Sequence, residues 1–134
     1  MFESVFGSQE KQPAGFSHAM VAILPVSDLA SAQRFFERLG FRVDYGENDY
    51  IMLSDDQGAQ LHLKKASPSF LKPANSAGLY LYTQDVDRLA AEFRDEILGP
   101  NKRPEQTEWG TYEFSLSGPD GAEIQVGWPI EQQS

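Results

Sequence analysis

One pattern is written twice in this chain of 134 residues. Residues 58–63 read GAQLHL and residues 121–126 read GAEIQV, so each stretch is a glycine turn followed by alternating polar and apolar positions. The two stretches lie 63 positions apart, and Asp28 and Asp85, each at the start of a helical pattern, lie 57 apart. This order indicates one folding unit used twice. Because a single small unit buries only one sheet face, the two units are expected to pair.

The first half begins with an apolar run, 20–26, that is typical of a buried strand, and Pro25 inside it favours a strand end or a sheet edge. Ser27 and Asp28 then supply a helix N-cap, and Gly40 ends the helix. Apolar residues recur along this helix at helical spacing, at Leu29, Ala32, Phe35, Phe36 and Leu39. Three more strands are expected, at 41–45, 50–53 and 60–64.

The second half repeats this order. A strand is expected at 79–83, and Asp85 is expected to cap a helix that ends at Gly99. The apolar positions of this helix are Val86, Leu89, Ala90, Phe93 and Ile97. A weak strand candidate at 103–108 precedes stronger ones at 111–116 and 123–128. Each half therefore reads strand, helix, strand, strand, strand.

The predicted organisation has five parts. They are a flexible arm at 1–17, a first βαβββ module at 18–65, a linker at 66–77, a second module at 78–130 and a tail at 131–134. The linker is rich in Ser, Pro, Ala and Asn, which favours a connecting segment. A chain of this length is expected to form one domain or two tightly joined halves.

Composition excludes several kinds of site. The chain has no Cys and two His, so disulfides, thiolate metal sites and His-rich metal sites are excluded. A net charge of −9 disfavours nucleic acid and anionic lipid, and it favours a cationic small molecule or a basic partner. No apolar run approaches the roughly 18–20 residues that span a bilayer, and the first residues lack the features of a secretory signal. We therefore expect no membrane partner and a cytoplasmic location.

Three stretches carry a resemblance to a known superfamily: VSDLASAQRFFERLGF at 26–41, QDVDRLAAEF at 84–93 and SGPDGAEIQV at 117–126. In this order they resemble the vicinal oxygen chelate superfamily, which includes glyoxalase I, extradiol dioxygenases, fosfomycin-resistance enzymes and bleomycin-resistance proteins. The resemblance covers roughly residues 20–128. It implies an α+β fold in which two βαβββ modules pair into a curved mixed sheet with a central cleft.

The metal enzymes of that superfamily place four ligands on the first and last strands of the two modules. By motif these positions fall on Val21, His62, Gly78 and Gln125. One imidazole and one neutral amide fall short of the about three ligands that a divalent ion needs, and His18 is out of phase with Val21. The resemblance therefore implies no metal, no cofactor and no catalytic residue, which makes an enzyme the less favoured interpretation.

Two further stretches, RLGFRVDYGENDYIML at 38–53 and EWGTYEFSLSGPDGAE at 108–123, resemble the bleomycin-resistance branch. The chain departs from that branch at Glu108, Gly118 and Ala122, where Pro, Asp and Asn are usual. Proteins of this branch sequester a bulky cationic glycopeptide, without transforming it, in grooves between two domain-swapped subunits. The resemblance implies a homodimer that confers antibiotic resistance by binding. It leaves open whether the two modules pair within one chain or are swapped between the two chains.

Seven residues are candidates for ligand binding. Tyr50 and Trp109 match the branch positions whose rings flank the ligand, Tyr80 and Tyr82 alternate onto one sheet face, and Met52 shares a face with Tyr50. His62 and Gln125 occupy the last-strand positions. Glu113 is expected to hold a hydrogen bond that fixes the loop carrying Trp109. Tyr80, Tyr82 and His62 remain open to a purely structural interpretation.

Two other functions remain open from the sequence. One is a metal-dependent glyoxalase-like or dioxygenase-like enzyme with an atypical site that recruits His62 with Glu113 or Glu123. The other is a binding module of the same superfamily for a different small metabolite.

Overall fold

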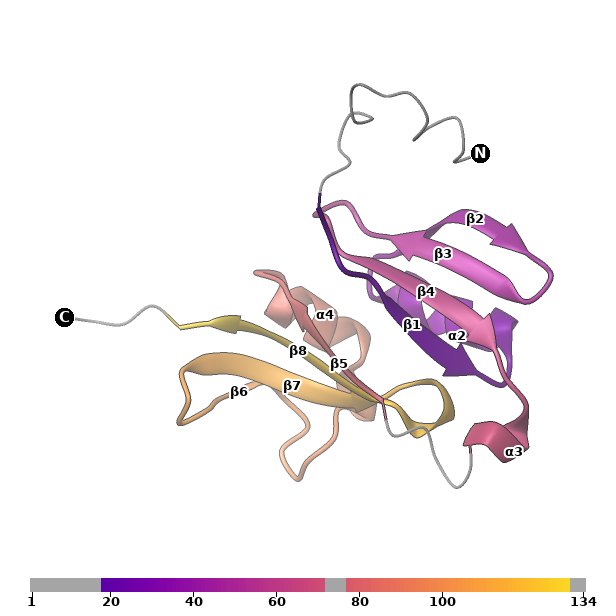
Figure 1. Cartoon of the computed structure of the whole chain (residues 1–134). Helices are drawn as coiled ribbons and strands as arrows, with labels where there is room; N and C mark the ends of the chain where they lie inside the picture. Colours follow the sequence, from indigo (N-terminus) through magenta and orange to yellow (C-terminus); the bar gives the residue numbers. More distant parts are fainter. Residues whose placement is uncertain (1–17, 72–76, 131–134) are drawn as a thin grey trace.

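The computed structural model describes residues 18–71 and 77–130, which form two four-stranded mixed sheets (Figure 1). Sheet A has the order β1-β4-β3-β2 and consists of β1 (Ala22–Val26), β2 (Arg42–Glu47), β3 (Tyr50–Ser54) and β4 (Gln60–Lys65). Sheet B has the order β5-β8-β7-β6 and consists of β5 (Gly78–Tyr82), β6 (Glu105–Gln106), β7 (Thr111–Ser117) and β8 (Glu123–Pro129). The predicted α+β fold of two βαβββ modules is confirmed.

The strand register repeats between the two sheets. β1 pairs in parallel with β4 and sets Ala22 opposite Leu61, whereas β5 pairs in parallel with β8 and sets Leu79 opposite Ile124. The offsets of these pairs are the same 57 and 63 positions that separate the two copies of the sequence pattern. Among the described residues β1 lies at the edge of sheet A, which is the position in a sheet where proline is tolerated, as expected for Pro25.

Helix α2 (Leu29–Arg38) begins and ends as the sequence predicts. The carboxylate of Asp28 accepts a hydrogen bond from the backbone N–H of Ser31 at 3.3 Å, which satisfies one free donor of the first turn. Gly40 follows the helix with φ = +100°, a conformation that glycine adopts without a Cβ penalty. Ala32 and Phe36 are buried against sheet A.

Helix α4 (Val86–Glu92) is shorter than predicted. A 3₁₀ turn, η1 (Arg94–Glu96), follows it, and Ile97 is extended and buried rather than helical. The predicted side-chain cap by Asp85 is wrong. Asp85 has φ = −88° and ψ = 34° instead of the extended backbone of an N-cap residue, and its Oδ2 accepts from Arg88, one turn further on, at 3.1 Å.

Two short elements were not predicted. The linker contains α3 (Pro68–Leu71), whose Leu71 is buried, and the β7–β8 turn contains η2 (Pro119–Gly121). Residues 72–76 of the linker, the predicted arm at 1–17 and the predicted tail at 131–134 lie outside the described residues. In the described part of the chain, no helix has the length and apolar character needed to cross a membrane.

The two modules share one hydrophobic core, and the helices join them. The fully buried Phe93 on the α4 side lies 5.5 Å from the ring of Phe35, and the guanidinium of Arg38 lies 4.1 Å above the Phe93 ring. Arg38 also pairs with Glu92 at 2.9 Å and with Glu96 at 2.6 Å. The hydrogen bond to Arg38 lowers the pKa of Glu96, so the pair stays charged across the neutral range.

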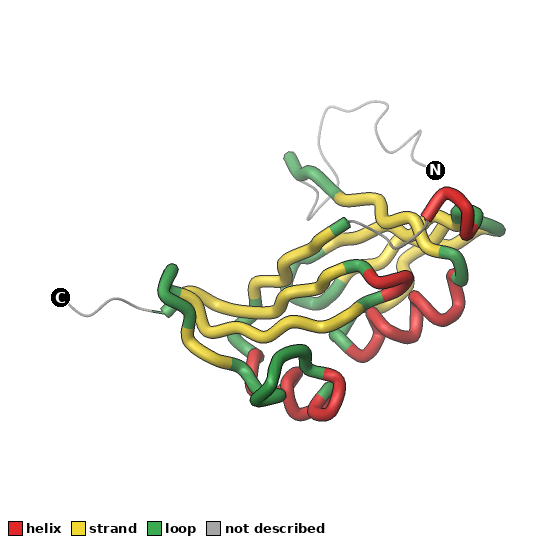
Figure 2. The backbone as a smooth tube through the Cα atoms, turned by 90° about the horizontal axis from the view of Figure 1, so that it is seen from below, coloured by secondary structure: helices red, strands yellow, loops and turns green. Residues whose placement is uncertain are grey.

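Both longer helices lie on the same side of the sheets. α2 and α4 are behind the sheets in Figure 1 and below them in Figure 2, which is turned by 90°. Within residues 18–71 and 77–130, the opposite face of each sheet carries neither of these helices, and only the short α3, through Phe70 beside Ile23 and Lys64, reaches the end of sheet A on that side. We call these surfaces open face A, on sheet A, and open face B, on sheet B.

Candidate functional site

Open face A collects three of the candidate residues. Leu61 and Leu63 of β4 point into the core, with 3% and 0% of their surface exposed, so His62 between them faces the other way. Met52 of β3 lies directly opposite His62. The hydroxyl of Tyr50 hydrogen-bonds to Nδ1 of His62 at 2.8 Å, and the two rings meet edge to face. Tyr50, Met52 and His62 thus form one half-buried cluster.

Two apolar side chains on this face were missed by sequence reasoning. Tyr45 lies opposite Met52 and Ile23 opposite His62, with 54% and 55% of their surfaces exposed. The pairing of β2 with β3 shifts between Val43 and Tyr45, and this bulge moves Tyr45 instead of Asp44 opposite Met52. The alternation of side chains along 42–47 was the signal that could have placed Tyr45 on this face. The extra residue of the bulge reverses that alternation for every residue beyond it.

Open face B carries the other strand candidates. Tyr80 lies opposite Gln125, and Tyr82 lies opposite Gly127. The ring centroids of Tyr80 and Tyr82 are 4.4 Å apart and the ring planes are inclined by 34°, so the two rings are in contact in a tilted arrangement. Tyr82 leaves 60% of its surface exposed. This pair gives open face B an aromatic surface next to the amide of Gln125.

A hydrogen-bond chain links this aromatic pair to the loop of Trp109. The carboxylate of Glu113 accepts hydrogen bonds from the hydroxyls of Tyr80 at 2.8 Å and Thr111 at 2.7 Å, both on Oε1. The hydroxyls of Thr111 and Thr107 are 2.8 Å apart, which closes the turn between them. The predicted anchoring role of Glu113 is therefore confirmed. Trp109 sits in this turn with 69% of its surface exposed.

The environment of Tyr80 changes its acidity. Burial, and then the hydrogen bond to the Glu113 carboxylate, raise the pKa of the Tyr80 hydroxyl from 10.0 to about 12. Both causes act in the same direction, because the phenolate is poorly solvated there and would lie beside a second negative charge. Tyr80 therefore remains a neutral hydrogen-bond donor to Glu113 at neutral pH.

A pH dependence of stability follows from this shift. Because the folded-state pKa lies above the unfolded value, the contribution of Tyr80 is complete below pH 10.0 and declines as the pH rises towards about 12. Urea unfolding of the wild type and of Tyr80→Phe at a series of alkaline pH values measures this contribution. We expect the difference in unfolding free energy to shrink across that window. A difference that stays constant contradicts the assigned environment.

The four positions that hold the metal ion in the superfamily's enzymes do not form a metal-binding group here. On open face B, Gly78 lies opposite Glu123, and the side-chain amide of Gln125 donates to the Glu123 carboxylate at 2.9 Å. On open face A, His62 lies opposite Ile23. Within residues 18–71 and 77–130, no three His, Cys, Asp or Glu side chains are grouped so that they would hold a metal ion. The arrangement favours hydrogen bonding and stacking as the chemistry of these faces.

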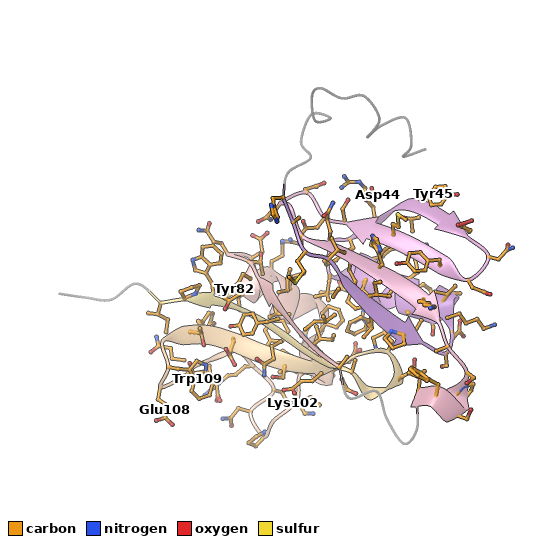
Figure 3. The ribbon with its side chains drawn as sticks, viewed as in Figure 1. Asp44, Tyr45, Tyr82, Lys102, Glu108 and Trp109 are labelled. Atoms are coloured by element: carbon orange, nitrogen blue, oxygen red, sulfur yellow. The ribbon has the colours of Figure 1, made fainter. Side chains whose placement is uncertain are left out.

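The seven candidates fall into two clusters and one loop instead of one cavity. Figure 3 shows Tyr45 on the outer strand of sheet A and Trp109 with Glu108 at the opposite end of the molecule, beside sheet B. A pocket of about 220 Å³ lies at the junction of the modules, but mainly apolar side chains such as Phe36, Leu61 and Leu79 line it. Among the candidates in the described residues, Tyr80 alone reaches it.

Comparison with known proteins gives a family and a set of similar folds. A sequence model of the Glyoxalase/Bleomycin resistance protein/Dioxygenase superfamily matches residues 15–126. No curated protein matches the chain by sequence. Among solved structures, a bleomycin resistance determinant encoded on the transposon Tn5 is 22% identical, with a TM-score of 0.69 over 84% of this chain and 98% of that one.

Two further structures are similar over most of their length. A bleomycin-binding protein in complex with bleomycin is 23% identical, with a TM-score of 0.67 over 84% of this chain and 98% of that one. TnmS3, an antibiotic binding protein from Streptomyces sp. CB03234, is 28% identical, with a TM-score of 0.64 over 87% of this chain and 99% of that one. At identities of 22% and 23%, the first two establish a shared fold.

Proposed function

Because the chain belongs to the glyoxalase/bleomycin resistance protein/dioxygenase superfamily, we propose that it binds a bulky, cationic aromatic small molecule and leaves it chemically unchanged. Such a protein protects by sequestration, as in antibiotic resistance. The observation that carries the proposal is the exposure of flat aromatic rings on and beside open face B, where Tyr82 and Trp109 are 60% and 69% exposed. Similar folds belong to a bleomycin-binding protein and an antibiotic binding protein.

The chemistry of these rings suits a flat cation. Stacking between aromatic planes contributes about 0.5–1.5 kcal/mol per pair beyond area burial, and a cation over tryptophan adds a comparable amount. The net charge of −9 raises the local concentration of a positively charged ligand around the molecule. Small molecules with a planar ring system and a positive charge are therefore the favoured ligand class.

We place the ligand in grooves between two copies of the chain. Within one chain both open faces point away from the helices on the same side, so they do not enclose a ligand between them (Figures 1 and 2). A two-fold axis would set open face A of one copy against open face B of the other, twice. Opposite charges are available across this contact, because open face A carries Lys64 as well as Glu47, and open face B carries Glu113 and Glu123.

Replacing Trp109 by alanine tests the ligand class. We expect Trp109→Ala to weaken binding of bleomycin, used as the probe, by about 10-fold or more, because a stacked and desolvated ring is lost. Isothermal titration gives the affinity of each variant. The matched control is Trp128→Phe, because Trp128 lies on the opposite face of β8, opposite Tyr112. This control also leaves Trp109 as the sole tryptophan, so fluorescence quenching then reports on that ring.

The outcomes separate the proposal from its alternatives. Equal affinity in the wild type and Trp109→Ala contradicts the assigned site. If the protein binds bleomycin without turnover but sediments as a monomer when bound, the ligand does not lie in a groove between two copies. Stoichiometric Mn, Fe, Ni or Zn in protein purified without chelator favours an enzyme with an atypical site. No heat with bleomycin, together with a thermal shift from another compound, favours a module for a different metabolite.

A further inference from the structure

A small open pocket of about 220 Å³, with both polar and apolar walls, lies beside Gly78, where β5 begins next to β8. Its walls are Leu79, Tyr80, Glu123 and Gln125. The glycine is not needed for the backbone, because Gly78 is absent from the glycines with positive φ. Nor does packing require it, since among the described residues a Cβ there would meet only the carbonyl oxygen of Glu123, at 3.8 Å. Its effect is to leave the pocket open.

The polar groups in this pocket are mostly hydrogen-bond acceptors. The amide nitrogen of Gln125 donates to Oε2 of Glu123 at 2.9 Å, which directs the amide oxygen of Gln125 away from that carboxylate. The Tyr80 hydroxyl donates to Glu113, so its proton is already used. The pocket therefore presents a carboxylate and an amide oxygen, and the complementary group is one that is positively charged and rich in N–H donors.

We propose that this pocket holds the protonated amine of the ligand, with Glu123 as the charged partner and Gln125 as the orienting acceptor. The inference rests on the proposed function, because it assigns one end of the same ligand to one end of open face B. The contacting rings of Tyr80 and Tyr82 continue along β5 from the pocket, since Tyr80 lines it and Tyr82 follows two residues later. A ligand whose amine occupies the pocket would thus have its flat ring beside Tyr80 and Tyr82.

Benzylamine and benzyl alcohol form a matched pair of probes, since they have nearly the same shape and differ in charge. The backbone amides of Gly78 and Gln125, followed by NMR, report on the pocket in the full-length chain. We expect benzylamine to shift both amides and to bind at least about 10-fold more tightly than benzyl alcohol. Equal responses to the two probes, or no response to either, overturn the proposal.

Two variants test the assignment of residues. Gly78→Leu fills the pocket without backbone strain, and it is expected to abolish the benzylamine response. Glu123→Gln keeps the shape and removes the charge, and it is expected to weaken benzylamine binding at least about 10-fold. Glu37→Gln, on the exposed surface of α2, changes the net charge equally and is expected to have no effect. Unchanged binding in Gly78→Leu contradicts the proposal.

The same variants distinguish failure of this inference from failure of the proposed function. If bleomycin binds the wild type, Gly78→Leu and Glu123→Gln with equal affinity, the pocket assignment is wrong and the stacking site stands. If bleomycin does not bind the wild type but benzylamine shifts Gly78 and Gln125, the amine pocket stands and the bleomycin-type function is wrong.

Discussion

Phe93→Ala is expected to lower the free energy of unfolding by about 3–5 kcal/mol, because it empties a fully buried site in the core. Phe93 has 0% of its surface exposed and lies where the helices of the two modules meet. The substitution leaves a cavity beside Phe35 and removes the ring beneath the guanidinium of Arg38. Because a domain of this size is stable by about 5–15 kcal/mol in total, the loss is a large share.

Urea unfolding followed by circular dichroism measures this loss. The matched control is Phe70→Ala, the same chemical change at a side chain of α3 with 71% of its surface exposed. We expect the control to differ from the wild type by no more than about 0.5 kcal/mol. A loss below about 1 kcal/mol in Phe93→Ala would show that the modules are not joined through this ring.

The repeat made the architecture predictable, because its signals are local. A turn glycine, a period of two and a period of 3.6 can each be read within about ten residues, so both modules and their order emerged from the sequence. The structure repeats the offsets of 57 and 63 positions in the pairs Ala22 with Leu61 and Leu79 with Ile124. Asp28 and Gly40 likewise act within a few residues of their own positions.

The predictions that were wrong and the elements that were missed depend on the local backbone or on contacts between distant residues. Asp85 has the residue type of a helix cap, but its backbone is not extended and its Oδ2 accepts from Arg88, and residue type alone reveals neither. α3 has four residues, which is too short for a helical period to be visible, whereas the weak strand candidate at 103–108 is confirmed by the two residues of β6. The contact of Arg38 with Phe93 joins positions 38 and 93, and no local pattern specifies such a pair.

The candidate site was predictable to the level of which side chains share a face. Alternation placed Tyr80 with Tyr82 and Tyr50 with Met52, and the sheets bear this out through the pairing of their strands. The pocket beside Gly78 was not predictable. The sequence indicated only that a glycine cannot bind a metal, whereas the consequence of the missing side chain depends on which groups of β8 lie opposite it.

Gly127→Ala is expected to lower the free energy of unfolding by about 3 kcal/mol. Gly127 is buried in β8, and a Cβ there would collide with the Tyr80 hydroxyl and lie 2.6 Å from Cβ of Glu113 and 2.9 Å from the backbone oxygen of Tyr112. Overpacking typically destabilises by about 1–3 kcal/mol. Displacing Tyr80 also breaks its hydrogen bond to the Glu113 carboxylate, which contributes about 1.5–3 kcal/mol.

Gly78→Ala is the matched control, because it adds the same methyl group to the same sheet where the nearest atom is 3.8 Å away. We expect it to change the unfolding free energy by no more than about 0.5 kcal/mol. A double-mutant cycle identifies the collision. Removing the hydroxyl with Tyr80→Phe in the Gly127→Ala background should restore part of the loss, because the obstructing atom is gone. If the effects of the two substitutions on the unfolding free energy are strictly additive, the loss in Gly127→Ala does not come from a collision with the Tyr80 hydroxyl.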